Sequence, residues 1–362
     1  MEKLLKNLCS IIGPSGFEIN VQKFILNEIR PYIDEFWIDA IGNLIVKIEK
    51  NSKNNLSILI DAHSDEVGFI VKKIESDGFI KFEKIGSIDD RRLQSQEVSI
   101  QTDKEIINGV IGLLSKHYTK WDDINRITPY YEMYIDIGAT SRECAENMGV
   151  RIGQPITFNK DLKFIGDRDS NRLYGKGIDN RAGCAVLIQL LKSIKTSQID
   201  HGDIYGVFSV QEEVGHRGIK ALNRNIKIDI AIVIDTGPSS DTCENIMDGN
   251  RKLGEGPLIK VMDNCFIANQ LIKDLFIDIA ERNGIPYQLD IFIGAGTNAG
   301  DIYLSRDNIF TGVLSIPSRY MHSPVEVVDM SDLYNTVLLL QKFLFESKNI
   351  NLQNNFKGDL YE

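Results

Sequence analysis

The sequence predicts an α/β protein: a mixed sheet sandwiched by helices, with an inserted small β-barrel-like domain. Residues 56–60 form a continuous apolar run, as expected for a strand covered on both faces. After Asp167, apolar strands alternate with amphipathic helices. From Phe69 to about Gly166, by contrast, the chain has mainly short alternating runs broken by Gly and Asp. One α/β domain interrupted by a β domain accounts for this order.

The chain opens with two predicted helices. The first carries its leucines and isoleucines on one face up to Ile12, and Gly13-Pro14-Ser15-Gly16 ends it before a second helix at about 18–32. A hairpin follows, with strands 36–38 and 44–48. The strand at 56–60 then leads into the polar sequence Asp61-Ala62-His63-Ser64-Asp65-Glu66.

The inserted domain is predicted to be mainly β. A single helix is expected within it, from the capping pattern Thr140-x-x-Glu143 to about Gly149. The predicted strands include 69–74, 79–84, 97–101 and 107–114. The resulting boundaries are residues 1–68 and 166–350 for the α/β domain, 69–165 for the insertion and 351–362 for a polar C-terminal tail.

The second part of the α/β domain alternates between strands and helices. We expect helices at 181–195, 268–283, 299–304 and 331–346, and strands at 204–210, 230–234, 287–293 and 310–316. The strand at 204–210 runs directly into Gln211-Glu212-Glu213. Ligands of open α/β sheets bind beyond the carboxyl ends of the strands, so this is a candidate site.

Composition excludes several classes of partner. The formal net charge is −10 with no large Lys/Arg cluster, which argues against nucleic acid. No signal peptide and no run of 18 uncharged apolar residues is found, so we expect neither secretion nor membrane insertion. The five cysteines are scattered and form no C-x-x-C pair. A cytoplasmic protein with reduced thiols is expected.

Five metal-competent side chains come at or near strand ends. Alone, each has an ordinary explanation; Asp179, for example, is well placed to cap the helix that starts at Arg181. Together, two imidazoles and three carboxylates suit Zn²⁺ or Co²⁺, and also accept Mn²⁺. The other histidines, His117, His201 and His216, are expected in ordinary loops or turns. The five candidate ligands are His63, Asp179, Glu213, Asp235 and His322.

These motifs, taken in order, resemble those of the di-metal aminopeptidases that include glutamyl aminopeptidase and the deblocking aminopeptidases. The resemblance spans nearly the whole chain and implies an α/β metallopeptidase domain with an inserted β domain. Some members of this family are labelled endoglucanases, and similar proteins form tetrahedral dodecamers. The motifs are residues 61–68, 177–183, 211–215, Asp235 and 319–324.

The resemblance also implies a role for each residue. Asp179 would bridge two divalent metal ions, with His63 and Asp235 on one and Glu213 and His322 on the other. Glu212 would be the general base that takes a proton from a di-metal-activated water, and Asp65 would hold the His63 ring. The expected substrates are peptides with a free N-terminus.

Two residues depart from the family pattern. Asn180 follows the proposed bridging residue, and Asn298 ends the loop Gly294-Ala295-Gly296-Thr297-Asn298, where many relatives have Asp. Neither change removes a predicted ligand. Both remove a negative charge, so the substrate preference of such relatives cannot be transferred to this chain.

Three functions other than that of an aminopeptidase also use some of these residues. A glycoside hydrolase needs two carboxyls on opposite sides of the scissile bond, which adjacent residues such as Glu212 and Glu213 seldom provide, and it leaves His63 and His322 unexplained. A di-metal deacylase or other amidohydrolase would use the same chemistry on another substrate. A non-catalytic assembly protein with structural metals is disfavoured by the intact Glu212.

Overall fold

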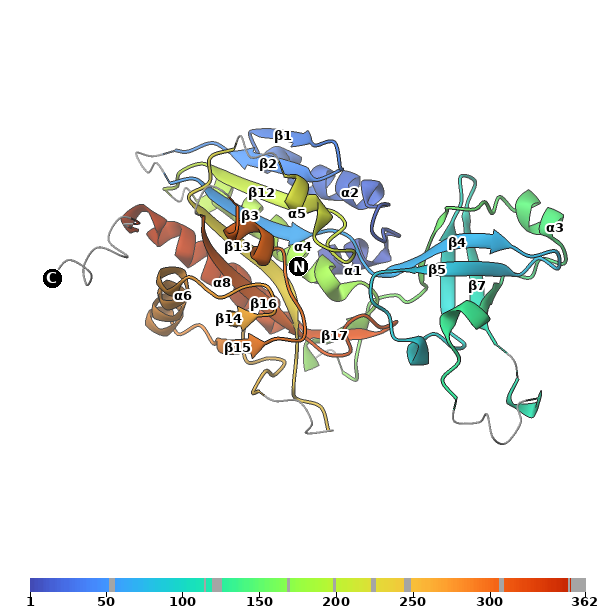
Figure 1. Ribbon diagram of the computed structural model, residues 1–362. Helices are drawn as coiled ribbons and strands as arrows, with labels where there is room; N and C mark the ends of the chain where they lie inside the picture. The colour runs from blue at the N-terminus through green and yellow to red at the C-terminus, as the bar shows by residue number, and fades with distance from the viewer. Residues whose placement is uncertain are drawn as a thin grey trace.

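The computed structural model describes residues 1–51, 56–113, 115–118, 126–167, 170–197, 200–222, 226–243, 249–305, 309–350 and 352. It consists of a helix-covered sheet and a closed β-barrel that projects to one side (Figure 1). This agrees with the predicted fold class. The predicted tail 351–362, apart from residue 352, and the last residue of the predicted strand 107–114 lie outside the described ranges.

The main sheet has eight strands in the order β1-β2-β12-β3-β13-β16-β14-β15. Its centre, β12-β3-β13-β16, is parallel, whereas β2 and β14 run antiparallel to their neighbours β12 and β16. The parallel centre brings the carboxyl ends of β12, β3 and β13 to one edge of the sheet. The strands are β1 (Glu35–Ile38), β2 (Leu44–Ile48), β3 (Ile58–His63), β12 (Ile204–Ser209), β13 (Ile230–Pro238), β14 (Leu258–Asp263), β15 (Gln288–Phe292) and β16 (Phe310–Ser318).

Helices cover both faces of this sheet, so its central strands are apolar on both sides. Alternate residues of β3 illustrate this: Ile58 and Ile60 pack into the core beneath the larger helices, and Leu59 packs into the core on the opposite face. The first face carries α1 (Glu2–Ser10), α2 (Ile19–Ile29), α4 (Ile178–Ser197), α6 (Gln270–Asn283) and α8 (Met330–Glu346). The second carries α5 (Arg217–Ala221) and α7 (Ala299–Tyr303).

The barrel follows β3 directly and has its own apolar core. Its strands are antiparallel and close in the order β4-β5-β8-β7-β6-β9. They are β4 (Gly68–Ile74), β5 (Ile80–Ile85), β6 (Glu97–Gln101), β7 (Ile106–Gly112), β8 (Tyr134–Asp136) and β9 (Pro155–Phe158). A separate three-stranded sheet joins β10 (Lys163–Phe164), β11 (Arg172–Gly175) and β17 (Glu326–Asp329).

Several elements differ from the prediction. The helix α3 (Arg142–Asn147) is capped by Ser141, whose hydroxyl accepts from the backbone of Cys144, and not by Thr140. β13 continues through Asp235 to Pro238, because it pairs with β16 along its whole length. The strand β14 and the short helix α5 were not predicted.

Among the described residues, no helix has the length and apolar character needed to cross a membrane.

The described residues also form short 3₁₀ turns: η1 (Arg30–Tyr32), η2 (Asp90–Arg92), η3 (Lys116–Tyr118), η5 (Tyr130–Glu132) and η7 (Ser347–Asn349).

Candidate metal centre

The carboxylate of Asp179 lies between two imidazoles. Its Oδ1 is 3.4 Å from His63 Nε2, and its Oδ2 is 3.3 Å from His322 Nε2. Asp179 and Asn180 interrupt the helical dihedral angles of α4 near its start, and Asp179 has an extended conformation with φ −76° and ψ 110°. Each oxygen of one carboxylate therefore faces a different histidine, as expected of a residue shared by two metal ions.

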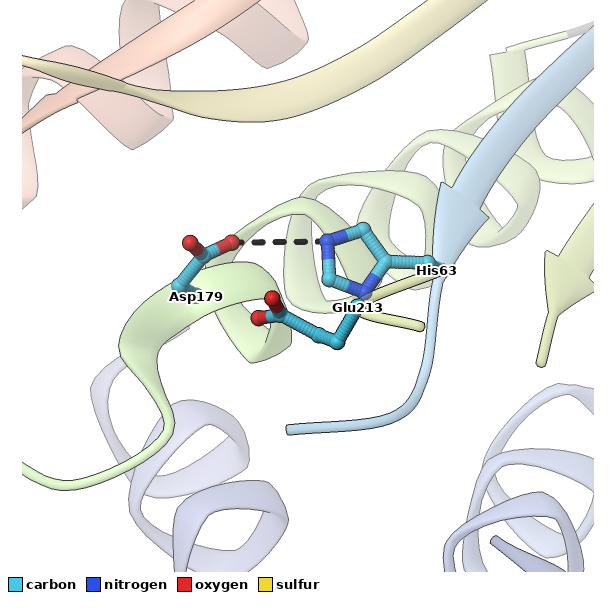
Figure 2. Close-up of side chains that lie close together, drawn as sticks. All are labelled: His63, Asp179 and Glu213. Atoms are coloured by element: carbon cyan, nitrogen blue, oxygen red, sulfur yellow. Dashed lines mark ion pairs between the residues drawn. The ribbon is translucent and has the colours of Figure 1, made fainter. Parts of the chain in front are cut away.

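The other two predicted ligands, Asp235 and Glu213, each lie beside one of the two imidazoles. Asp235 Oδ1 is 3.4 Å from His63 Nε2, and Glu213 Oε2 is 3.2 Å from His322 Nε2. The ligand atoms of His63, Asp179 and Glu213 all lie within 4.8 Å of one another (Figure 2). All five predicted ligands meet in one centre, although they come from positions up to 259 residues apart, 63 to 322, in the sequence. Their function as ligands stays a prediction.

Both imidazoles turn the same nitrogen toward the centre. His63 Nδ1 faces Asp65 Oδ1 at 3.3 Å, and His322 Nδ1 lies 2.9 Å from the backbone oxygen of Ser87. A ring that donates from Nδ1 has Nε2 free to bind a cation, which is the arrangement that metal-ligating histidines adopt. Ser87 lies after β5, so the inserted part of the chain contributes to the site.

Asp65 also contacts the backbone of the turn after β12. Its Oδ1 accepts from the backbone N–H of Glu212 and its Oδ2 from that of Glu213, each at 3.1 Å, and Ser15 Oγ donates to Oδ2 at 2.6 Å. Asp65 is fully buried. One carboxylate thus joins the end of β3 to the turn after β12.

Glu326 makes similar contacts on the opposite side, and it was not among the predicted site residues. Its Oε2 accepts from the backbone N–H of Asp179 at 2.8 Å, and its Oε1 accepts from that of His322 at 2.9 Å. Glu326 begins β17 and is almost completely buried. An acid at the start of an apolar strand was the signal that could have identified it.

Burial and neighbouring acids shift the pKa values of both imidazoles and of Glu213. Burial lowers the pKa of His322, but Glu213 and Asp179 outweigh it and raise that pKa to about 12. Burial likewise opposes the positive charge of His63, yet its acidic neighbours raise its pKa well above the usual value. Burial raises the pKa of Glu213 to about 7. The centre thus favours positive charge at both imidazoles, and dications would take the place of those protons.

The donor set fits divalent metal ions. Asp179 Oδ1 and Glu213 Oε1 are buried oxygens without a hydrogen-bond donor among the described residues. Buried carboxylate oxygens are costly unless something positive pairs with them. With two imidazole nitrogens beside them, the donors match Zn²⁺ or Co²⁺ better than an all-oxygen Ca²⁺ site.

Glu212 lies beside the centre, at the wall of a cavity of about 520 Å³. Its Oε2 is 3.8 Å from His63 Nε2 and its Oε1 is 3.3 Å from His216 Nε2. Burial raises the pKa of Glu212, while His63 and His216 oppose that shift. The glycine loop 294–297 also lines the cavity, together with residues of the inserted part such as Ser87 and Arg92.

The two asparagines that depart from the family pattern make structural contacts. Asn180 Nδ2 donates to the backbone oxygen of Ile234 at 2.9 Å. Asn298 Nδ2 donates to Asp61 Oδ2 at 2.7 Å and to Ser209 Oγ at 2.9 Å. Asn298 thereby ties the start of α7 to the strands β3 and β12.

One of the remaining histidines differs from its predicted surroundings. His201 is buried, not exposed in a turn. His216 directly precedes α5, and its ring points to Glu212 and Asp301. Left-handed backbone conformations at non-glycine residues also gather here: four of the six in the described part, Gln211, His216, Tyr320 and His322, border the site. Such conformations are often retained at functional sites.

Comparisons with known proteins show which family the chain resembles. The model of the M42 glutamyl aminopeptidase family matches residues 42–339. A protein of Acetivibrio thermocellus with a provisional aminopeptidase name is 40% identical over 341 residues, covering 94% of this chain and 97% of that protein. The structure of a TET aminopeptidase from Thaumarchaeota archaeon SCGC AB-539-E09 superposes with a TM-score of 0.90 at 32% identity, covering 96% of this chain and 98% of that one.

The Pyrococcus horikoshii TET1 peptidase, which can assemble into a tetrahedron or a large octahedral shell, superposes with a TM-score of 0.85 at 34% identity, covering 95% of this chain and 99% of that one. These similarities extend over almost the whole of each protein. The chain therefore belongs to the M42 glutamyl aminopeptidase family and is an aminopeptidase, a hydrolase of peptide bonds.

Proposed function

We propose that this aminopeptidase holds two divalent metal ions and uses Glu212 as its general base. His63 and Asp235 would bind one ion, Glu213 and His322 the other, and Asp179 both. The observation that carries this proposal is the pairing of the two Asp179 oxygens with different imidazoles, 3.4 Å and 3.3 Å away. The donor set supports Zn²⁺ or Co²⁺, with Mn²⁺ also compatible.

Metal ions bound here would polarise the peptide carbonyl and lower the pKa of a water molecule. Glu212 is placed to take a proton from that water, because its Oε2 faces the centre and lines the cavity. The water oxygen forms the new bond to the first peptide carbon. Glu212 then returns the proton to the departing nitrogen, which leaves as an amine when the C–N bond breaks.

Peptides with a free N-terminus are the proposed substrates, in keeping with the family. The cavity of about 520 Å³ is of ordinary size for a small-ligand site. Asp179, Glu212, Glu213 and Asp235 line it together with His63, His216 and His322.

The test uses the purified protein with Zn²⁺ or Co²⁺ and unblocked aminoacyl-nitroanilides. We expect hydrolysis that a chelator abolishes, and a loss of about 10²-fold or more in kcat for Glu212→Gln with its metal content unchanged. Glu105→Gln, an exposed acid in the barrel, is the matched control. Loss of metal in Glu212→Gln would make Glu212 a ligand, and full activity of this variant would exclude it as the base.

The glycoside hydrolase alternative receives no support from the site. Glu212 and Glu213 line one cavity together with His63 and His322, and two glycosidase acids would leave both imidazoles without a function. A deacylase would share the metal centre. Parallel assays with N-acylated amino acids and cellulose distinguish these activities from that of an aminopeptidase.

We further propose that residues 1–68 and 166–350 are the catalytic unit and that residues 69–165 mediate assembly into a tetrahedral dodecamer. The Pyrococcus horikoshii relative supports the assembly, and the exposed Ile106 and Val110 on β7 offer apolar surface on the barrel. Light scattering tests the twelve-subunit state. The five free cysteines support a cytoplasmic location, which cell fractionation tests.

A further inference from the structure

His216 stands between two carboxylates, outside the set of proposed metal ligands. Its Nε2 is 3.3 Å from Glu212 Oε1, and its Nδ1 is 2.7 Å from Asp301 Oδ2. Both ring nitrogens face acceptors, so both carry hydrogen and the ring is positively charged. The pairing with Glu212, followed by that with Asp301, raises the pKa of His216 to about 9 although burial opposes it.

We propose that His216, oriented by Asp301, is a positioning residue that holds Glu212 with Oε2 turned toward the metal centre. This inference rests on the proposed function of Glu212 as general base. The two carboxylate oxygens of Glu212 have different partners. Its Oε1 is paired with His216, and its Oε2 lies 3.8 Å from His63 Nε2. A base whose reacting oxygen is fixed before the substrate binds avoids an ordering cost during the reaction.

Asp301, which orients His216, is itself held in place by residues around the site. The backbone N–H of Asp301 donates to the oxygen of Asn298 at 3.1 Å, and Asn298 is bound to Asp61 and Ser209. Asp61 lies in β3 and Ser209 ends β12, the strands that lead to His63 and Glu212. Asp301 is thus fixed relative to the residues that His216 must align.

The side chain of His216 does not act as a helix cap. It is the N-cap residue of α5, yet its side chain makes no capping hydrogen bond to that helix. Its backbone is in the left-handed region at φ 56°, which a non-glycine residue adopts at some cost. Among the residues that the structure describes, the charged groups that face it are Glu212 from the turn after β12 and Asp301 from α7, with Lys220 of α5 3.7 Å from Asp301.

The experiment measures kcat, KM and metal content for His216→Leu, His216→Gln and Asp301→Asn in the metal-loaded enzyme. We expect His216→Leu to lower kcat about 10- to 100-fold, the range for partners that orient a reacting group, with little change in KM or metal content. His216→Gln should recover part of this loss, because its amide nitrogen can still donate to Glu212. Asp301→Asn should show a smaller loss in kcat. His117→Leu, at an exposed histidine in η3, is the matched control.

A second set of variants separates this inference from the function on which it depends. In the residual activity of Glu212→Gln, adding His216→Leu should cause no further loss, since the two residues act through one group. Wild-type kcat in His216→Leu together with an inactive Glu212→Gln would overturn the positioning function alone. An active Glu212→Gln would overturn the general base and this inference together. Equal losses in all three single variants, accompanied by loss of metal, would show a merely structural function and also overturn the inference.

Discussion

Asp65 Oδ1 lies 3.3 Å from His63 Nδ1, on the side of the ring that faces away from the metal centre. The same carboxylate accepts hydrogen bonds from the backbone of Glu212 and Glu213. A buried acid that touches neither the cavity nor the opposite imidazole therefore holds three predicted functional residues in place. Replacing Asp65 should therefore change the metal centre without removing a predicted ligand.

Asp65→Asn is expected to lower metal affinity and kcat about 10- to 100-fold. An asparagine keeps one acceptor, but its NH₂ group would face either the Glu212 or the Glu213 backbone N–H and could not accept from it. Titration with Zn²⁺ in competition with a chromogenic chelator measures the affinity. Asp103→Asn, at an exposed position, is the control. An affinity equal to that of the wild type would contradict this assignment.

Glu326→Gln tests the opposite side of the centre. Both oxygens of Glu326 accept from backbone N–H groups, of Asp179 and His322, and an amide can satisfy only one of them. We expect metal affinity to fall about 10- to 100-fold, with the more weakly held ion lost first. Elemental analysis after dialysis should then find fewer metal ions per chain than in the wild type, and two tightly held ions would refute the expectation.

Metal binding should stabilise the folded protein. A ligand that binds only the folded state at 100 times its Kd adds about 2.7 kcal/mol to the free energy of unfolding. Zn²⁺ or Co²⁺ should therefore raise Tm in thermal unfolding, and His322→Gln should reduce that rise because one imidazole ligand is gone. Ca²⁺, which prefers oxygen ligands, is the control cation. An identical rise in His322→Gln would remove His322 from the ligand set.

Glu66 lies in a buried ion pair close to the site. Both of its oxygens are 2.9 Å from Lys176 Nζ, and Arg181 Nη2 is 3.5 Å from its Oε1. Glu66→Gln would leave two buried cations without their partner, so the free energy of unfolding should fall by about 3 to 5 kcal/mol. Glu2→Gln, in the half-exposed pair with Lys6, should cost less than about 1 kcal/mol. Denaturant titration followed by circular dichroism compares the two, and equal losses would contradict the prediction.

The strand β14, the helix α5 and the contacts of His216 were not predicted, each for a physical reason. The strand β14 was missed because Lys260 interrupts its apolar run; the structure buries that lysine against Asp290 at 3.0 Å, a pairing between distant positions. The helix α5 spans only five residues, too few for a helical period to be seen. His216 was assigned to an ordinary loop because its partner Asp301 lies on another element.

By itself, the sequence determined the alternation of strands and helices, the inserted β-rich stretch and the five metal-competent side chains, because strand propensity, periodicity and strand-end motifs are properties of neighbouring residues. Only the tertiary structure decided that Asp179 presents one oxygen to His63 and the other to His322. It also gave Asp65 its two backbone partners, and Glu326 and His216 theirs. These contacts depend on the order of strands in the sheet, which places β3 beside β12 although more than 140 residues separate His63 from Ser209, positions 63 and 209.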